Sequence, residues 1–124
     1  MARILIIDDE APMRRMVRGI LEQAGYEVVE ADEGCAGMQR HEDTPAEMIL
    51  TDLFMAGQEG LETIKRLRQM DPQVKIIAMS GGGKVGFTED FLELAALFGA
   101  KRTLQKPFSQ EELLDAVWDV LQSE

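Results

Sequence analysis

The chain has 124 residues, of which 45% are hydrophobic and 6% aromatic, so its length suits one globular domain and leaves no room for a second core. The formal net charge is −10, from 23 acidic and 13 basic residues. This charge argues against direct binding of nucleic acid or an anionic membrane surface, since both are recognised through lysine and arginine. With one cysteine and no apolar stretch near the roughly 20 residues of a membrane span, we expect a single cytoplasmic domain, residues 1–124.

Short apolar runs alternate with amphipathic segments from one end of the chain to the other. Strands are expected at residues 4–7, 26–31, 47–51, 74–79 and 101–105. The first of these is a continuous apolar run, which is typical of a strand buried on both faces of a sheet. Five strands, each followed by a helix, predict a parallel sheet with helices on both faces, a three-layer α/β sandwich.

The five expected helices are marked by apolar residues at helical spacing. They begin near Pro12, cover roughly residues 33–42, extend from Leu61 to Met70, cover residues 87–98, and follow Ser109. Ser109 and Glu112 form a Ser-x-x-Glu capping box at the start of the last helix. The apolar positions of this helix are Leu113, Leu114, Val117, Trp118 and Leu121.

Polar residues end four of the five expected strands. Asp8 and Asp9 follow the first strand, Asp52 the third, Ser80 the fourth and Lys106 the fifth. Because the carboxyl ends of parallel strands share one edge of the sheet, these side chains are expected to meet there. Clustered carboxylates need a compensating cation, and oxygen ligands alone favour Mg²⁺ or Mn²⁺. A metal ion and a lysine around one carboxylate are the parts that phosphoryl transfer requires.

These motifs together resemble the receiver domain of two-component response regulators. They are the string Ile6-Ile7-Asp8-Asp9-Glu10, Asp52 at the end of an apolar strand, Ser80 after residues 76–79, and Lys106-Pro107-Phe108. The resemblance covers the whole chain and implies a flavodoxin-like sheet of strand order 2-1-3-4-5 with five helices. It also implies that Asp52 accepts a phosphoryl group from a sensor histidine kinase or a phosphotransfer protein.

Further roles are implied by the same resemblance. Asp9 would bind Mg²⁺ directly and Asp8 through water, with Asp52 and the backbone carbonyl of Phe54 completing the metal site. Ser80 and Lys106 would bind the phosphoryl group and switch the conformation, with a cis peptide before Pro107. The chain would catalyse only its own phosphorylation and dephosphorylation. It would control an output partner as a monomer or a weak phosphorylation-dependent dimer.

One departure from the family pattern leaves an alternative open. Thr103 stands three residues before Lys106, where receivers usually carry an aromatic residue or histidine. The chain could therefore be a degenerate receiver that acts as a phosphorylation-independent interaction module. If the switch is intact, the glycine-rich residues 81–86 are expected to carry the conformational response. His41, the only histidine, is expected to be an exposed residue of the second helix and not a phosphodonor.

Two other functions on this fold fit the residues less well. A flavin carrier would need a Ser/Thr/Gly-rich phosphate loop after the first strand, where this chain has Asp8-Asp9-Glu10. An aspartyl phosphatase would need a D-x-D pattern around Asp52, and in this chain Asp52 is followed by Leu53 and Phe54.

Overall fold

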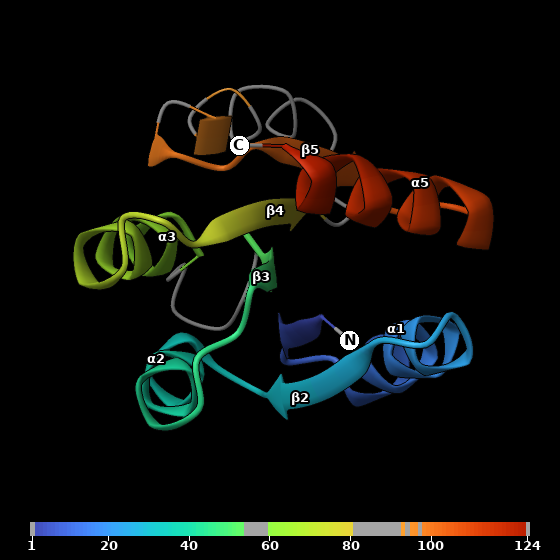
Figure 1. Ribbon diagram of the computed structural model, residues 1–124, viewed down its shortest axis with the longest axis horizontal. Coiled ribbons are helices and arrows are strands. Elements are labelled where there is room, and N and C mark those ends of the chain that lie inside the picture. The colour runs from blue at the N-terminus through green and yellow to red at the C-terminus, as the bar shows by residue number, and fades with distance from the viewer. Residues whose placement is uncertain (1, 54–59, 81–92, 94, 97, 124) are drawn as a thin grey trace.

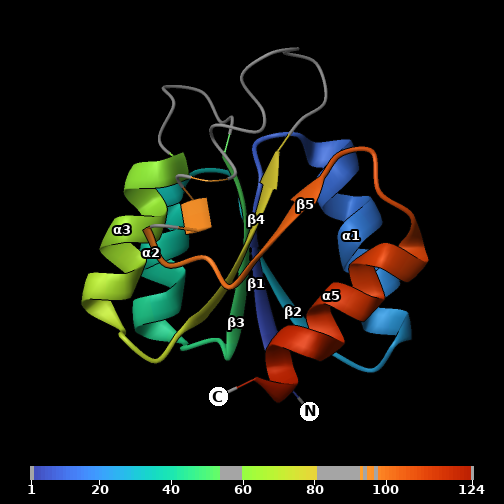
Figure 2. The same ribbon diagram turned by 90° about the horizontal axis from the view of Figure 1, so that it is seen from above.

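A computed structural model describes residues 2–53, 60–80, 93, 95–96 and 98–123. Within these ranges the chain forms a five-stranded parallel sheet with helices on both faces (Figures 1 and 2). The strands are β1 (Arg3–Ile7), β2 (Glu27–Ala31), β3 (Met48–Asp52), β4 (Lys75–Ser80) and β5 (Arg102–Gln105). Their order is β2-β1-β3-β4-β5, which confirms the predicted three-layer, flavodoxin-like sandwich.

Four helices have defined bounds in the described part of the chain. They are α1 (Ala11–Gln23), α2 (Gly34–Asp43), α3 (Gly60–Met70) and α5 (Gln110–Gln122). Most of the fourth expected helix, residues 87–98, lies outside the described residues. Glu93, Ala95, Ala96 and Phe98 are helical. The glycine-rich residues 81–86 lie outside the described residues as well.

The hydrophobic core has two halves, one on each face of the sheet. Helices α1 and α5 cover one face, and α2 and α3 cover the other (Figure 2). Along β1, Ile4 and Ile6 enter the first half, while Leu5 and Ile7 enter the second, because successive side chains of a strand point to opposite faces. All four are at most 1% exposed, so the continuous apolar run is buried on both faces as predicted.

The capping box of α5 is present. The Glu112 N–H donates to Ser109 Oγ over 3.0 Å, and the Ser109 N–H donates to Glu112 Oε1 over 3.2 Å. Trp118, one of the apolar positions of this helix, is 59% exposed. The face of α5 that packs on the sheet carries Leu113, Ala116, Val117 and Val120, the i, i+3, i+4, i+7 positions of one helical stripe. Trp118 lies outside this stripe.

His41 is only 3% exposed, so the expectation of an exposed residue was wrong. Helix α2 approaches the sheet closely because Gly37 faces β1, where an added Cβ would lie 2.3 Å from the Ile7 Cδ1 atom. His41 lies one turn further along the same helix face. Its Nδ1 accepts the Ala46 N–H over 3.0 Å, and its Nε2 lies 3.0 Å from Asp71 Oδ2. In the neutral ring Nε2 therefore carries the proton and donates to Asp71.

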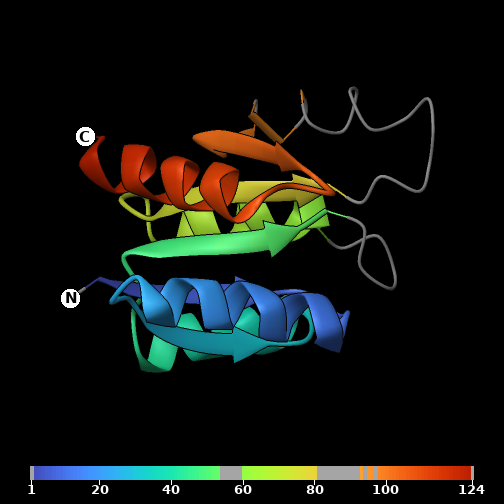
Figure 3. The same ribbon diagram turned by 90° about the vertical axis from the view of Figure 1, so that its right-hand side faces the viewer.

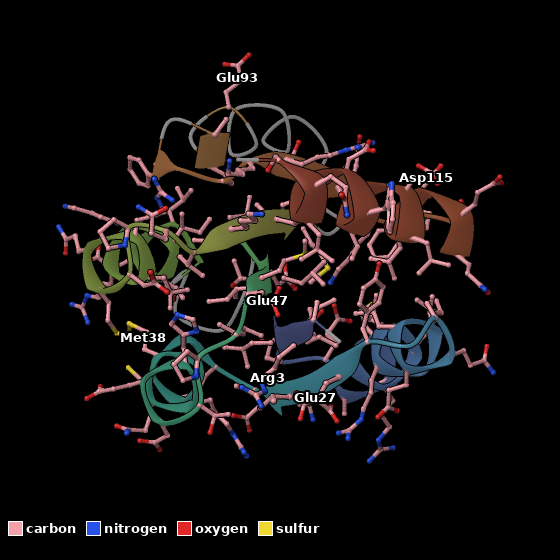
Figure 4. The ribbon with its side chains drawn as sticks, viewed as in Figure 1. Arg3, Glu27, Met38, Glu47, Glu93 and Asp115 are labelled. Atoms are coloured by element: carbon pink, nitrogen blue, oxygen red, sulfur yellow. The ribbon has the colours of Figure 1, made fainter. Side chains whose placement is uncertain are left out.

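An ion pair joins the amino-terminal ends of β1 and β2, at the edge of the sheet opposite the carboxyl ends of the strands. Arg3 and Glu27 lie side by side (Figure 4), with Arg3 Nε 2.9 Å from Glu27 Oε2. The same view shows Glu47 near the entry to β3 and Asp115 on the outer side of α5. These charged groups are partly or fully exposed, whereas the side chains of Asp8, Asp52 and Lys106 are buried at the opposite edge of the sheet.

Candidate functional site

The carboxyl ends of all five strands lie at one edge of the sheet (Figure 3). Asp8 directly follows β1, Asp52 is the last residue of β3, Ser80 is the last residue of β4, and Lys106 follows β5. The strand register sets Asp52 beside Met79 of β4 and Ser80 beside Gln105 of β5. The fold therefore brings these four predicted site residues to one edge.

A buried lysine joins two of the carboxylates. Lys106 Nζ donates to Asp8 Oδ2 and to Asp52 Oδ2, each over 3.0 Å. The exposed fractions are 6% for Lys106, 0% for Asp8 and 2% for Asp52. Lys106 is held at its main chain too, because its N–H donates to the Ser80 carbonyl oxygen over 2.8 Å. The ammonium group is thus fixed between the ends of β1 and β3.

The charges of this cluster depend on one another. Burial raises the pKa of Asp8, against the opposing effects of the Glu10 N–H, 2.9 Å from Asp8 Oδ1, and of Lys106. Burial alone would lower the pKa of Lys106, but the carboxylates of Asp52 and Asp8 raise it above its ordinary value. The lysine therefore stays protonated at neutral pH and compensates part of the buried negative charge.

A third carboxylate belongs to the site and was not predicted from the sequence. Oxygen atoms of Asp8, Glu10 and Asp52 lie within 4.8 Å of one another, and Glu10 Oε1 is 3.6 Å from Lys106 Nζ. Three carboxylates exceed the charge of one ammonium, and their oxygen atoms are the ligands that Mg²⁺ prefers. The residues present therefore fit a hard divalent cation.

The position of Glu10 could have been inferred from the strand pattern. In an extended chain side chains alternate, so the residue two positions after Asp8 returns to the same side. Glu10 has an extended backbone (φ −88°, ψ 104°). Asp9 is exposed and is not a member of this carboxylate group among the residues that the structure describes. Its direct coordination of a metal stays a prediction, and the carbonyl of Phe54 lies outside the described residues.

The remaining predicted site residues occupy the edge of the sheet near Lys106. Ser80 is fully buried, and its Oγ has no hydrogen-bond partner in the described structure, which is costly for a hydroxyl group. The expected cis peptide is present between Lys106 and Pro107. Thr103 is partly buried and pairs in register with Ala78 of β4, so β5 carries no aromatic side chain at that position.

An open parallel sheet with an acidic, lysine-bridged cluster of side chains at its carboxyl edge defines a flavodoxin-like domain with an oxygen-rich candidate site. A family model for the response regulator receiver domain matches residues 4–118. The chain therefore belongs to the response regulator receiver family of two-component systems.

Individual proteins agree with this assignment. The chain is 34% identical over 116 residues to the chemotaxis protein CheY of Bacillus subtilis, covering 93% of each protein. It is also 34% identical over 121 residues to the response regulator receiver protein CpdR of Brucella abortus, covering 98% of each. A solved response regulator receiver domain protein from Clostridium thermocellum has a TM-score of 0.88 at 26% identity, covering 98% of this chain and 94% of that one.

Family membership carries general properties. Receiver domains interact with histidine kinases and output domains, and they generally bind Mg²⁺ at an acidic pocket. In this chain, Asp8, Glu10 and Asp52 form an acidic cluster that could hold such an ion. None of the described helices combines the length and the apolar character that crossing a membrane requires.

Proposed function

We propose that this chain is a phospho-acceptor switch in which Asp52 takes a phosphoryl group from a sensor histidine kinase or a phosphotransfer protein. The observation that carries the proposal is the buried Lys106 ammonium, bonded to both Asp52 and Asp8 with Glu10 beside it. The phosphorylated chain then changes conformation and controls an output partner. We place this activity in the cytoplasm, with the chain acting as a monomer or a weak phosphorylation-dependent dimer.

The chemistry is an in-line exchange at phosphorus. A carboxylate oxygen of Asp52 forms a P–O bond while the P–N bond of the donor phosphohistidine breaks, and the leaving imidazole nitrogen takes up a proton. Asp8, Glu10 and Asp52 would hold Mg²⁺, which when bound would neutralise charge on the phosphoryl oxygen atoms. The chain turns over no external substrate and catalyses only its own phosphorylation and dephosphorylation.

Two residues are suited to hold the product. Lys106 already donates to Asp52. Because its ammonium group has three N–H donors, a small displacement would let it donate to a phosphoryl oxygen on Asp52 as well. The Ser80 hydroxyl is buried and has no hydrogen-bond partner among the described residues, so a phosphoryl oxygen at the neighbouring strand end could serve as its acceptor. Formation of this bond is the local event from which a change in conformation could spread.

Thr103 supports one alternative. Thr103 stands where receivers usually carry an aromatic residue or histidine, so phosphoryl binding at Ser80 would not be passed to an aromatic ring on β5. Without that coupling, the chain could act as a phosphorylation-independent interaction module. The acidic site would then be present without serving as a switch. The two functions differ in whether the conformation changes after exposure to a phosphodonor.

The test is intact mass spectrometry after incubation with acetyl phosphate, with and without Mg²⁺. We expect the wild type to gain one base-labile phosphoryl group only when Mg²⁺ is present, and Asp52→Asn to gain none. Asp115→Asn, an exposed change on α5, is the control and should behave as wild type. An equal adduct in Asp52→Asn would remove Asp52 from its role. An adduct on the wild type that leaves its amide NMR spectrum unchanged would favour the alternative.

A further inference from the structure

Arg14 connects the acidic site to the edge strand of the sheet. It lies in the first turn of α1, and its guanidinium group makes two hydrogen bonds in different directions. Nη1 donates to the main-chain carbonyl oxygen of Asp8 over 2.8 Å, and Nε donates to Glu30 Oε1 of β2 over 2.8 Å. The side chains of Arg14 and Glu30 are only 18% and 23% exposed.

Strand β2 consequently holds the main chain of Asp8 on both sides. The Asp8 N–H donates directly to the Ala31 carbonyl oxygen over 3.1 Å. The Asp8 carbonyl oxygen is bound to the same strand indirectly, through Arg14 and Glu30. With its backbone fixed, Asp8 directs one carboxylate oxygen to the Glu10 N–H and the other to Lys106.

The stability of α1 does not explain an arginine at this position. A positive charge in the first turn opposes the helix dipole, which favours negative groups there. No acidic residue occupies the first turn of α1, so Arg14 has no neighbour in that turn to offset its charge. Its partners are the Asp8 carbonyl and Glu30, and the planar fork of an arginine can serve both at once.

Glu30 is a firm anchor for this contact. Arg18 Nη1 donates to its second oxygen over 2.5 Å, so one carboxylate receives two guanidinium groups. The hydrogen bond from Arg18 and then that from Arg14 lower the pKa of Glu30 against the effect of burial. Glu30 therefore stays ionised at neutral pH and keeps Arg14 in place.

We propose that Arg14 is a positioning residue for the acidic site, acting through the Asp8 main chain. The inference rests on the proposed function, because it concerns the same carboxylates. Arg14 bonds to the Asp8 carbonyl and to none of the carboxylates that would hold a metal ion. Without its bond, the turn between β1 and α1 can relax, and the Asp8 carboxylate must be ordered anew when a cation binds.

Arg14→Gln and Arg18→Gln form a matched pair for the test. Both remove one positive charge and one hydrogen bond to Glu30, but only Arg14→Gln removes the donor to the Asp8 carbonyl. Calorimetric titration of the full chain with Mg²⁺ should show about five- to tenfold weaker binding for Arg14→Gln, the typical effect of one lost hydrogen bond. Arg18→Gln should stay within about twofold of wild type. Equal affinity of Arg14→Gln and wild type, or an equal loss in both variants, would overturn the inference.

A second measurement separates this inference from the proposed function. The carboxyl ¹³C resonance of Asp8 in metal-free protein should shift or broaden in Arg14→Gln and stay in place in Arg18→Gln. An unchanged resonance in Arg14→Gln would show that Arg14 does not position Asp8. If the wild type bound no Mg²⁺, the proposed function would fail, while the ¹³C spectrum would still decide the role of Arg14.

Discussion

Replacing Lys106 by methionine should destabilise the metal-free protein in a strongly pH-dependent way. Methionine fills a similar volume, so the change removes mainly the ammonium charge and its bonds to Asp8 and Asp52, both 3.0 Å long. These carboxylates are 0% and 2% exposed, and removing one partner of a buried ion pair typically costs about 3 to 5 kcal/mol.

Proton uptake limits this cost. The ordinary pKa of Asp8 is 3.8, so neutralising such a carboxyl costs about 4 kcal/mol at pH 7 and only about 1.6 kcal/mol at pH 5. The expected loss is therefore about 3 to 4 kcal/mol at pH 7 and less than half of that at pH 5.

The sign depends on the direction of the pKa changes. Burial raises the pKa of Asp8 in the folded state, so this group's contribution to stability is largest at low pH. It declines as pH rises from the unfolded pKa through the folded one. Loss of Lys106 raises the pKa of Asp8 in the folded state further. The stabilising contribution of Asp8 then declines over a wider pH range that extends toward pH 7. In the wild type, the stabilising charge of Lys106 persists below its ordinary pKa of 10.5, since the folded pKa is raised.

Urea unfolding in EDTA, followed by far-UV circular dichroism at pH 5 and pH 7, measures both losses. Lys65→Met changes an exposed lysine of α3 and is the control, expected to alter stability by less than about 0.5 kcal/mol. Mg²⁺ should restore more stability to Lys106→Met than to wild type, because the variant site carries one positive charge fewer. A loss of equal size at both pH values, or one below about 1 kcal/mol at pH 7, would refute the reasoning.

Two further changes test other parts of the structure. Glu10→Gln should weaken Mg²⁺ binding several-fold in a calorimetric titration, because it removes one of three converging carboxylates. The remote change Glu111→Gln is the control and should leave the affinity for Mg²⁺ unchanged. Equal affinities of Glu10→Gln and wild type for Mg²⁺ would exclude Glu10 from the site. His41→Leu should lower the free energy of unfolding by about 2 to 3 kcal/mol, since the buried Ala46 N–H loses its acceptor. Arg40→Leu, an exposed neighbour, should change it little, and a matching loss there would point to the helix instead of the hydrogen bond.

The sheet and most of the site could be predicted because each depends on short, local signals. Continuous apolar runs mark strands buried on both faces, and a parallel sheet brings their ends together whatever the connecting segments do. The meeting of Asp8, Asp52 and Lys106 is a consequence of that rule alone. The observed strand ends differ from the predicted ones by only about one residue. For example, β1 was predicted to start at Ile4 and starts at Arg3.

The sequence was least informative where packing between elements decides the outcome. Trp118 is an apolar position of α5, yet it is exposed, and the face of the helix that packs on the sheet includes Ala116 and Val120 instead. His41 was expected to be an exposed residue of the second helix, but Gly37 lets α2 approach the sheet, and His41 on the same helix face is buried. Glu10 was missed because a third acidic residue in a row looks like an ordinary solvated charge.

The contacts of Lys106 with Asp8 and Asp52 determine whether the chain needs a metal ion in order to fold. Domains whose acidic or thiolate ligands are held together by their metal ion alone remain unfolded until that ion is supplied. Here Lys106 is a counter-ion encoded in the chain itself, bonded to two of the three carboxylates. We therefore expect the domain to fold before a metal ion is bound, and binding of the ion would add stability to a structure that has already formed.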